Sequence, residues 1–207
     1  MSTQLFINAH IATGMPGSTA AETAAIQDIL VEDGKFISIA PHLKATLEAQ
    51  GKDMASVEVV DLGGKLVCPP FCDTHLHLDY VFTARKPGAV NESGTLFEGI
   101  QRWSETKADL TVDEIKERAK IGIAKEMRHG VQFIRSHADV TDPNLTSLKA
   151  LLELKEELKD TVTLQIVSFP QEGMYSYEGP HGESGADLVE EGLKMGADCV
   201  GGIPHFE

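Results

Sequence analysis

The chain has 207 residues and a formal net charge of −14 at pH 7, because 32 acidic side chains outnumber 18 basic ones. Such acidity argues against a nucleic-acid partner, whose phosphates are bound mainly by lysine and arginine. No apolar run approaches the roughly 18 residues that a membrane-spanning helix needs, and no secretory signal is visible at the N-terminus.

Residues 1–64 are predicted to form a small β-rich domain. Asp33 and Gly34 join two short strand-forming segments, and this dipeptide favours a two-residue hairpin turn. In chain order, the predicted elements are a strand at 5–11, strands at 28–32 and 35–39, a helical or irregular segment at about 42–51, and a further β-rich segment at 57–64. No residue in this part is predicted to have a catalytic or ligand-binding role.

From Lys65 onward the pattern changes to a strand followed by a helix, several times over. Thr111 and Glu114 have the spacing of a helix capping box, and a leucine stripe from Leu145 to Leu158 marks one face of another helix. The predicted elements are a strand that ends in His75 and His77, helices at about 95–105 and 111–129, a strand at 131–137, the leucine-rich helix, a strand at 162–169, a helix at 185–195 and a strand at 198–204.

These strands are nearly all apolar, which is typical of parallel strands buried on both faces. Each is followed by polar side chains, and the C-terminal ends of parallel strands are where α/β barrels and open sheets carry their active sites. The polar residues are His75 and His77; Arg135, His137 and Asp139; Gln171 and Glu172; and His205 and Glu207. The alternative is that they only mark where the strands reach solvent.

The fold class predicted for the whole chain is therefore α/β, with residues 65–207 forming the first four βα units of a (β/α)8 barrel. A complete barrel needs about 250 residues. We accordingly expect the chain to be the N-terminal half of a longer protein, and we expect the 207-residue piece alone to be inactive.

The segment from Asp73 to Asp79 contains the strongest indication of chemistry. In an extended strand, residues two apart share one face, so His75 and His77 should project together with Asp73, while Cys72 faces the other way. Two neutral imidazoles side by side suit a divalent transition metal. The alternative is a pair of surface or hydrogen-bonded histidines.

The three cysteines are an odd number in a chain without a visible export signal, so we expect free thiols in a reducing cytoplasm. Cys68 and Cys72 lie close to the histidines and raise the possibility of a zinc cluster. The predicted orientation of Cys72 and the lack of a second close cysteine pair argue against that reading.

Several segments of the second part resemble the amidohydrolase superfamily, and within it the bacterial cytosine deaminases of the amidohydrolase type. The first barrel strand of the superfamily is similar to residues 68–79, which include Cys68-Pro69-Pro70-Phe71 and His75-Leu76-His77-Leu78-Asp79. The narrower resemblance is carried by Asn91–Ile100, Phe169-Pro170-Gln171-Glu172-Gly173 and Ile203-Pro204-His205-Phe206-Glu207. It covers residues 64–207 and is looser before them, where a small β-sandwich domain is implied.

This resemblance implies a distorted barrel with one iron(II) or zinc ion and hydrolytic deamination of cytosine to uracil and ammonia. His75 and His77 match the first two metal ligands, and Gln171 matches a pyrimidine-binding glutamine. The other ligands and the proton-shuttling glutamate of the family lie beyond residue 207, so no catalytic residue is assigned here. Dinuclear relatives use a lysine on the fourth strand, whereas Lys194 falls on the preceding helix, which favours one metal ion.

Three readings of the function remain open after this resemblance. The first is a cytoplasmic deaminase of pyrimidine salvage, which as a full-length protein is expected to form homo-oligomers. The second is a deaminase of another cyclic amidine, such as isocytosine, creatinine or an aminotriazine. The third is an inactive truncated half-barrel. For the neighbouring residues, we expect Asp79 to orient a ligand or cap its loop, and Arg135 and His137 to form a structural hydrogen-bonded pair.

Overall fold

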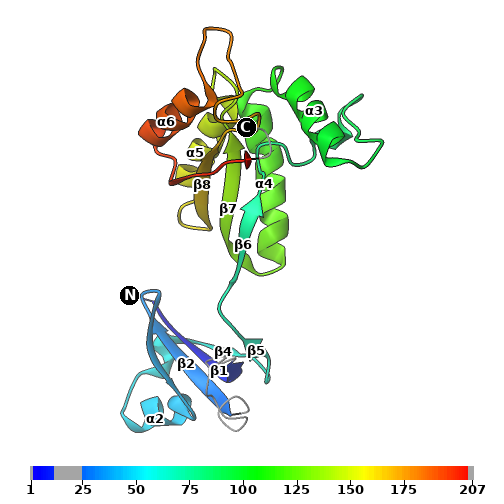
Figure 1. Ribbon diagram of the computed structural model, residues 1–207. Coiled ribbons are helices and arrows are strands. Elements are labelled where there is room, and N and C mark those ends of the chain that lie inside the picture. Colours follow the sequence, from blue (N-terminus) through cyan, green and yellow to red (C-terminus); the bar gives the residue numbers. More distant parts are fainter. Residues whose placement is uncertain (1, 12–24, 205–207) are drawn as a thin grey trace. The chain divides into compact units, whose positions relative to one another are not determined.

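The computed structural model describes residues 2–11 and 25–204 (Figure 1). The chain divides into two compact units, Met1–Pro69 and Pro70–Glu207. The predicted division into domains at residues 1–64 and 65–207 stays a prediction. His205, Phe206 and Glu207, which we placed at the end of the fourth barrel strand, lie outside the described residues.

The first unit contains a five-stranded sheet with the order β3-β2-β1-β4, and β5 also pairs with β1. Asp33 and Gly34 both have positive φ angles, 47° and 75°, and they close the predicted antiparallel hairpin between β2 and β3. Leu5, Leu30 and Val57 lie in its small core. The elements are β1 (Thr3–Ile11), β2 (Ile26–Glu32), β3 (Lys35–Ala40), α2 (Leu43–Ala49), the 3-10 helix η1 (Met54–Ser56), β4 (Val57–Asp61) and β5 (Leu66–Val67).

The second unit is a parallel four-stranded sheet with the sequential order β6-β7-β8-β9, and helices connect its strands (Figure 1). Sequential parallel strands with helical crossovers are the arrangement of a partial α/β barrel, as predicted. The elements are β6 (Phe71–Leu76), the 3-10 helix η2 (Thr83–Arg85), α3 (Leu96–Lys107), α4 (Val112–Arg128), β7 (Val131–Asp139), α5 (Thr146–Glu157), β8 (Thr163–Phe169), α6 (Gly185–Met195) and β9 (Cys199–Val200).

One face of this sheet packs against helices and holds the main core. Ile134 and Ile166 point from β7 and β8 into a cluster with Ile115 of α4 and with Leu148 and Leu151 of α5. All five side chains are at most 1% exposed. Alternation along β7 then sends Phe133, Arg135 and His137 to the opposite face, so the helix layer fixes which side chains face the site.

The capping box predicted at the start of α4 is present. The Thr111 side chain accepts a hydrogen bond from the backbone N–H of Glu114, and the Glu114 side chain accepts one from the backbone N–H of Thr111. We expect Thr111→Ala to lower the free energy of unfolding by about 1 kcal/mol, because one helix-terminal N–H loses its partner. Thermal or urea denaturation would measure this loss. Thr163→Ala, an exposed position in β8, is the control, and equal losses in both variants would contradict the capping role.

The predicted orientation of Cys72 is wrong. Cys72 pairs with Phe133, whereas Asp73 pairs with Ile134 and Leu76 pairs with Ser136, so β6 carries a bulge between Asp73 and Leu76. The extra residue reverses the alternation within the strand. Cys72 therefore shares the face of Phe133, opposite the helices, and lines a small cavity there.

Candidate metal centre

Three imidazoles meet at the C-terminal end of the sheet. His75 is the fifth residue of β6, His77 follows that strand, and His137 lies near the end of β7. The rings of His75 and His137 are stacked with centroids 4.1 Å apart, and His77 lies 5.4 Å from each. One nitrogen from each ring falls within 4.8 Å of the others, a spacing that a single metal ion could bridge.

The protonation of these rings also suits a metal. Burial lowers the pKa of His77 to about 4, helped by the neighbouring His137 and His75. Burial and the nearby His75 likewise lower the pKa of His137. The Nδ1 atoms of His77 and His137 are buried without a hydrogen-bond partner among the described residues. Neutral imidazole rings are the ligands that Zn²⁺ and Fe²⁺ accept, and each of the three rings has a nitrogen within bridging distance of the others, so the residues present fit a divalent ion.

His137 differs from its predicted role. We expected a hydrogen-bonded pair of Arg135 and His137, but the Arg135 Nε donates to the Gln165 Oε1 at 2.5 Å, and His137 instead stacks on His75. The two residues lie on the same face of β7, two positions apart. Only His137, which is nearer the C-terminal end of the strand, contacts the other histidines. The sequence signal was present, since His137, like His75, lies near the C-terminal end of a predicted apolar strand.

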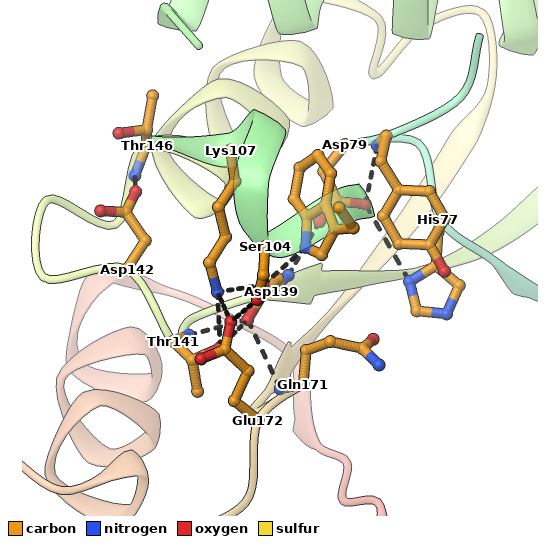
Figure 2. Close-up of polar contacts among 12 residues, drawn as sticks. His77, Asp79, Ser104, Lys107, Asp139, Thr141, Asp142, Thr146, Gln171 and Glu172 are labelled. Carbon is orange, nitrogen blue, oxygen red and sulfur yellow. Dashed lines mark hydrogen bonds and ion pairs between the residues drawn. The ribbon is translucent and has the colours of Figure 1, made fainter. Parts of the chain in front are cut away.

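The histidines lie in a cavity of about 760 Å³, which Gln171 also lines. Gln171 follows β8 and is 5% exposed. Its backbone N–H points toward the Asp139 Oδ1 at 3.4 Å, while Figure 2 shows its side chain extending to the side where His77 lies. Apolar walls are added by the side chains of Leu96, Ile100, Trp103 and Phe169.

The loop before α3, which is held by hydrogen bonds within itself, forms another part of the cavity wall. Both oxygens of Glu98 accept backbone N–H groups, from Glu92 at 3.1 Å and Ser93 at 2.6 Å. The pKa of Glu98 is lowered to about 2, mainly by hydrogen bonds from Ser93. Asn91 ties the same loop together, since its amide donates to the Thr95 carbonyl and accepts from the Gly94 N–H. The conformation of this loop is therefore fixed by its own local hydrogen bonds.

Two buried carboxylates, those of Asp79 and Asp139, lie next to the histidine cluster (Figure 2). The Asp79 Oδ2 accepts the backbone N–H of Asp139 at 2.9 Å, and the Asp79 Oδ1 accepts that of Tyr80 at 3.1 Å. The same Oδ1 lies 4.0 Å from the His77 Nδ1, which is too far for a hydrogen bond. Burial raises the pKa of Asp79 to about 7. Of its two predicted roles, the structure favours capping the loop after β6.

Asp139 is at the centre of a second set of contacts. Its carboxylate receives hydrogen bonds from Trp103, Lys107 and Thr141, all at 3.0 Å or less. Lys107 also contacts Glu172 at 2.6 Å, and Ser104 donates to the same Glu172 oxygen. The sequence places Asp139 and Glu172 among the polar residues at the strand ends but predicts no role for either.

Comparison with known proteins identifies the family. Residues 58–207 match the sequence model of the amidohydrolase family. The chain belongs to this family. It is 30% identical over 187 residues to N-isopropylammelide isopropyl amidohydrolase of Pseudomonas sp. (strain ADP), a match that covers 88% of the chain and 43% of that protein.

Solved structures place this amidohydrolase among cytosine-deaminase-like proteins. A 5-methylcytosine deaminase from Klebsiella pneumoniae liganded with 5-fluorocytosine is 41% identical, with a TM-score of 0.80. The same enzyme liganded with phosphonocytosine is 39% identical, with a TM-score of 0.79. Each match covers 98% of this chain and 44% of that one, so the chain spans less than half the length of these relatives. Within the described residues, no helix combines the length and apolarity needed to cross a bilayer.

Proposed function

We propose that the full-length protein hydrolytically deaminates a pyrimidine base, converting cytosine to uracil and ammonia. The observation that carries this proposal is one cavity that contains both the cluster of His75, His77 and His137 and the amide of Gln171. The relative with 41% identity that was solved with 5-fluorocytosine supports the same substrate class.

We assign His75 and His77 as two ligands of one divalent ion, iron(II) or zinc. When bound, such an ion supplies a hydroxide nucleophile near neutral pH by lowering the pKa of water. The His77 ring stays neutral at pH 7, because its pKa is about 4, so it keeps a lone pair for the ion. His137 stacks on His75 and holds that ring in place from the neighbouring strand.

Gln171 is the residue that we assign to substrate binding. Its amide carries both a donor and an acceptor, which matches the mixed hydrogen-bonding edge of a pyrimidine. Its backbone is held by Asp139, so the amide is presented from a fixed point at the end of β8. The apolar side chains of Leu96, Trp103 and Phe169 line the same cavity and exclude water from a bound ring.

Another cyclic amidine is the second candidate substrate. The relative from Pseudomonas sp. (strain ADP) is named for an ammelide, and a Rhizobium rhizogenes protein that is 28% identical over 152 residues is named pterin deaminase. A cavity of about 760 Å³ would admit rings larger than cytosine. We prefer cytosine as the substrate because the 5-methylcytosine deaminase is 41% identical to this chain, whereas the ammelide-named relative is 30% identical.

A substrate panel tests the proposal. The full-length protein, loaded with Fe²⁺ or Zn²⁺, would be assayed for ammonia release from cytosine, 5-methylcytosine, isocytosine, creatinine, an aminotriazine and a pterin. We expect the highest kcat/KM on a cytosine and loss of that activity after chelation. Efficient turnover of another ring without turnover of any cytosine would overturn the first choice.

Three further expectations belong to this proposal. We infer that residues 1–207 alone are inactive, that the full-length enzyme is a homo-oligomer, and that it works in the cytoplasm. The last is supported by Cys68, Cys72 and Cys199, which are all free thiols. Size-exclusion chromatography with light scattering would test the oligomer, and an ammonia assay on the 207-residue piece would test its inactivity.

A further inference from the structure

We propose that Asp139 is a positioning residue that acts through Trp103 and Tyr80 to fix the ring plane of His77. We call the three rings of His77, Tyr80 and Trp103 the aromatic ladder. This inference rests on the proposed function, because it gives His77 the task of a metal ligand. It adds a reason why that ligand keeps one orientation.

The ladder joins three separate parts of the second unit. The ring of Tyr80 stacks on His77, with centroids 4.5 Å apart and planes 22° from parallel. The indole of Trp103 lies 4.9 Å from the Tyr80 ring. Trp103 then donates its Nε1–H to the Asp139 Oδ2 at 2.7 Å. A residue at the end of β7 is therefore connected to a histidine after β6 through α3.

His77 needs this support more than an ordinary metal-binding histidine does. Such a ring is usually oriented by a hydrogen bond from its second nitrogen to a carboxylate or carbonyl. The closest carboxylate oxygen recorded for His77 belongs to Asp79, 4.0 Å from Nδ1, which is too far for a hydrogen bond. Nδ1 makes no hydrogen bond of normal geometry within the described residues, although the backbone of His137 lies near enough to act on the pKa of the ring. The stacked Tyr80 ring instead restricts rotation of the imidazole about its side-chain bond.

Asp139 is suited to be the fixed end of the ladder. Its side chain is 0% exposed, and each of its oxygens accepts at least two hydrogen bonds. Oδ1 accepts the Thr141 N–H at 2.8 Å and the Thr141 hydroxyl at 2.6 Å, while Oδ2 accepts Trp103 at 2.7 Å and Lys107 at 3.0 Å. A carboxylate held from both sides cannot swing, so the indole that it binds is held as well.

The chemistry of Asp139 also identifies the variant that breaks the ladder. Every hydrogen-bond partner of the Asp139 carboxylate is a donor. An asparagine amide at this position has one oxygen and one NH₂ group, so in either orientation its NH₂ group faces donors that it cannot accept from. Asp139→Asn therefore either loses the bond to Trp103 directly or loses the Thr141 bonds that hold the side chain in place, and both outcomes loosen the fixed end of the ladder. Trp103→Phe is the milder change, because it keeps an apolar ring and removes only the indole N–H and part of the ring surface that contacts Tyr80.

The test measures the metal site directly in the full-length protein loaded with Co²⁺. We expect Trp103→Phe and Asp139→Asn to alter the visible absorption spectrum of bound Co²⁺ and to weaken Co²⁺ binding by about tenfold or more. Asp142→Asn is the matched control. Asp142 also accepts two backbone N–H groups, from Asn144 and Thr146, but it caps α5 outside the ladder (Figure 2), so its Co²⁺ spectrum and affinity should be unchanged.

The outcomes separate this inference from the proposed function. An unchanged Co²⁺ spectrum and affinity in Trp103→Phe would overturn the ladder, whatever happens to activity. If Asp139→Asn does not fold, the Trp103→Phe result decides alone. Retention of the metal by His77→Ala would overturn both proposals, whereas tight His77-dependent Co²⁺ binding without any deaminase activity would remove only the proposed reaction.

Discussion

His75→Ala and His77→Ala, each in the full-length protein, are expected to remove most of the bound metal and to lower deaminase activity by more than about 100-fold. Even partners that only orient a metal ligand typically change affinity or activity by 10–100-fold, so loss of a ligand itself should cost more. The rings lie 5.4 Å apart and face one point, so neither can replace the other. Metal analysis and an ammonia assay on the same samples would measure both effects.

His129→Ala is the control for this pair. His129 ends α4 as an exposed residue, and its ring contacts only the Lys125 carbonyl within the same helix among its recorded contacts. We expect wild-type metal content and activity from it. A metal content that survives both His75→Ala and His77→Ala would mean that the ion binds elsewhere, and the assignment of this end of the sheet would fail.

Local sequence signals predicted most elements of the fold, because they act within a few residues. The Asp33-Gly34 turn, the Thr111 capping box and the leucine stripe of α5 each correspond to observed structure. Parallel pairing in the second unit followed from apolar strands with helical crossovers. Polar residues at the strand ends then indicated where the site lies, and the first unit's β1–β4 parallel pairing was not predicted because no local pattern encodes it.

The bulge in β6 shows what alternation alone cannot predict. A single extra residue between Asp73 and Leu76, where Thr74 and His75 oppose one residue of β7, reverses the faces of Cys72 and Asp73 but leaves His75 and His77 in the same cluster. The inference about the histidine pair was safe because it spans only two residues. The inference about Cys72 failed because it carried the same alternation across the irregular position.

His137 and Asp139 were visible as polar residues but not as parts of the site. Their roles depend on contacts across strands, since His137 stacks on His75 and Asp139 binds Trp103 and Lys107. Such contacts need the register of β6 against β7 and the position of α3. Strand spacing pointed to His75 and His77 as metal ligands, and the resemblance to known deaminases supplied Gln171, whereas the contacts of Asp139 with Trp103 and Lys107 came only from the structure.

Gln171→Ala is expected to separate substrate binding from metal binding. Gln171 lines the cavity of the histidines, but it follows β8 and is not part of the histidine cluster, so metal content should stay at the wild-type level. The loss should appear in kcat/KM for the pyrimidine, at about 1–3 kcal/mol or roughly 5- to 150-fold, which is typical when a buried polar partner is left unpaired. Steady-state kinetics and metal analysis would measure the two properties.

A second substitution at this position and a control at another glutamine sharpen the result. Gln171→Glu keeps an acceptor but loses the amide donor, so it should lose activity as well if the base needs both. Gln165→Ala is the control, because Gln165 lies lower on β8, accepts from Arg135 and lines a different cavity. Equal losses of kcat/KM in Gln171→Ala and Gln165→Ala, or loss of metal in Gln171→Ala, would show that the amide supports the barrel wall and does not bind the substrate.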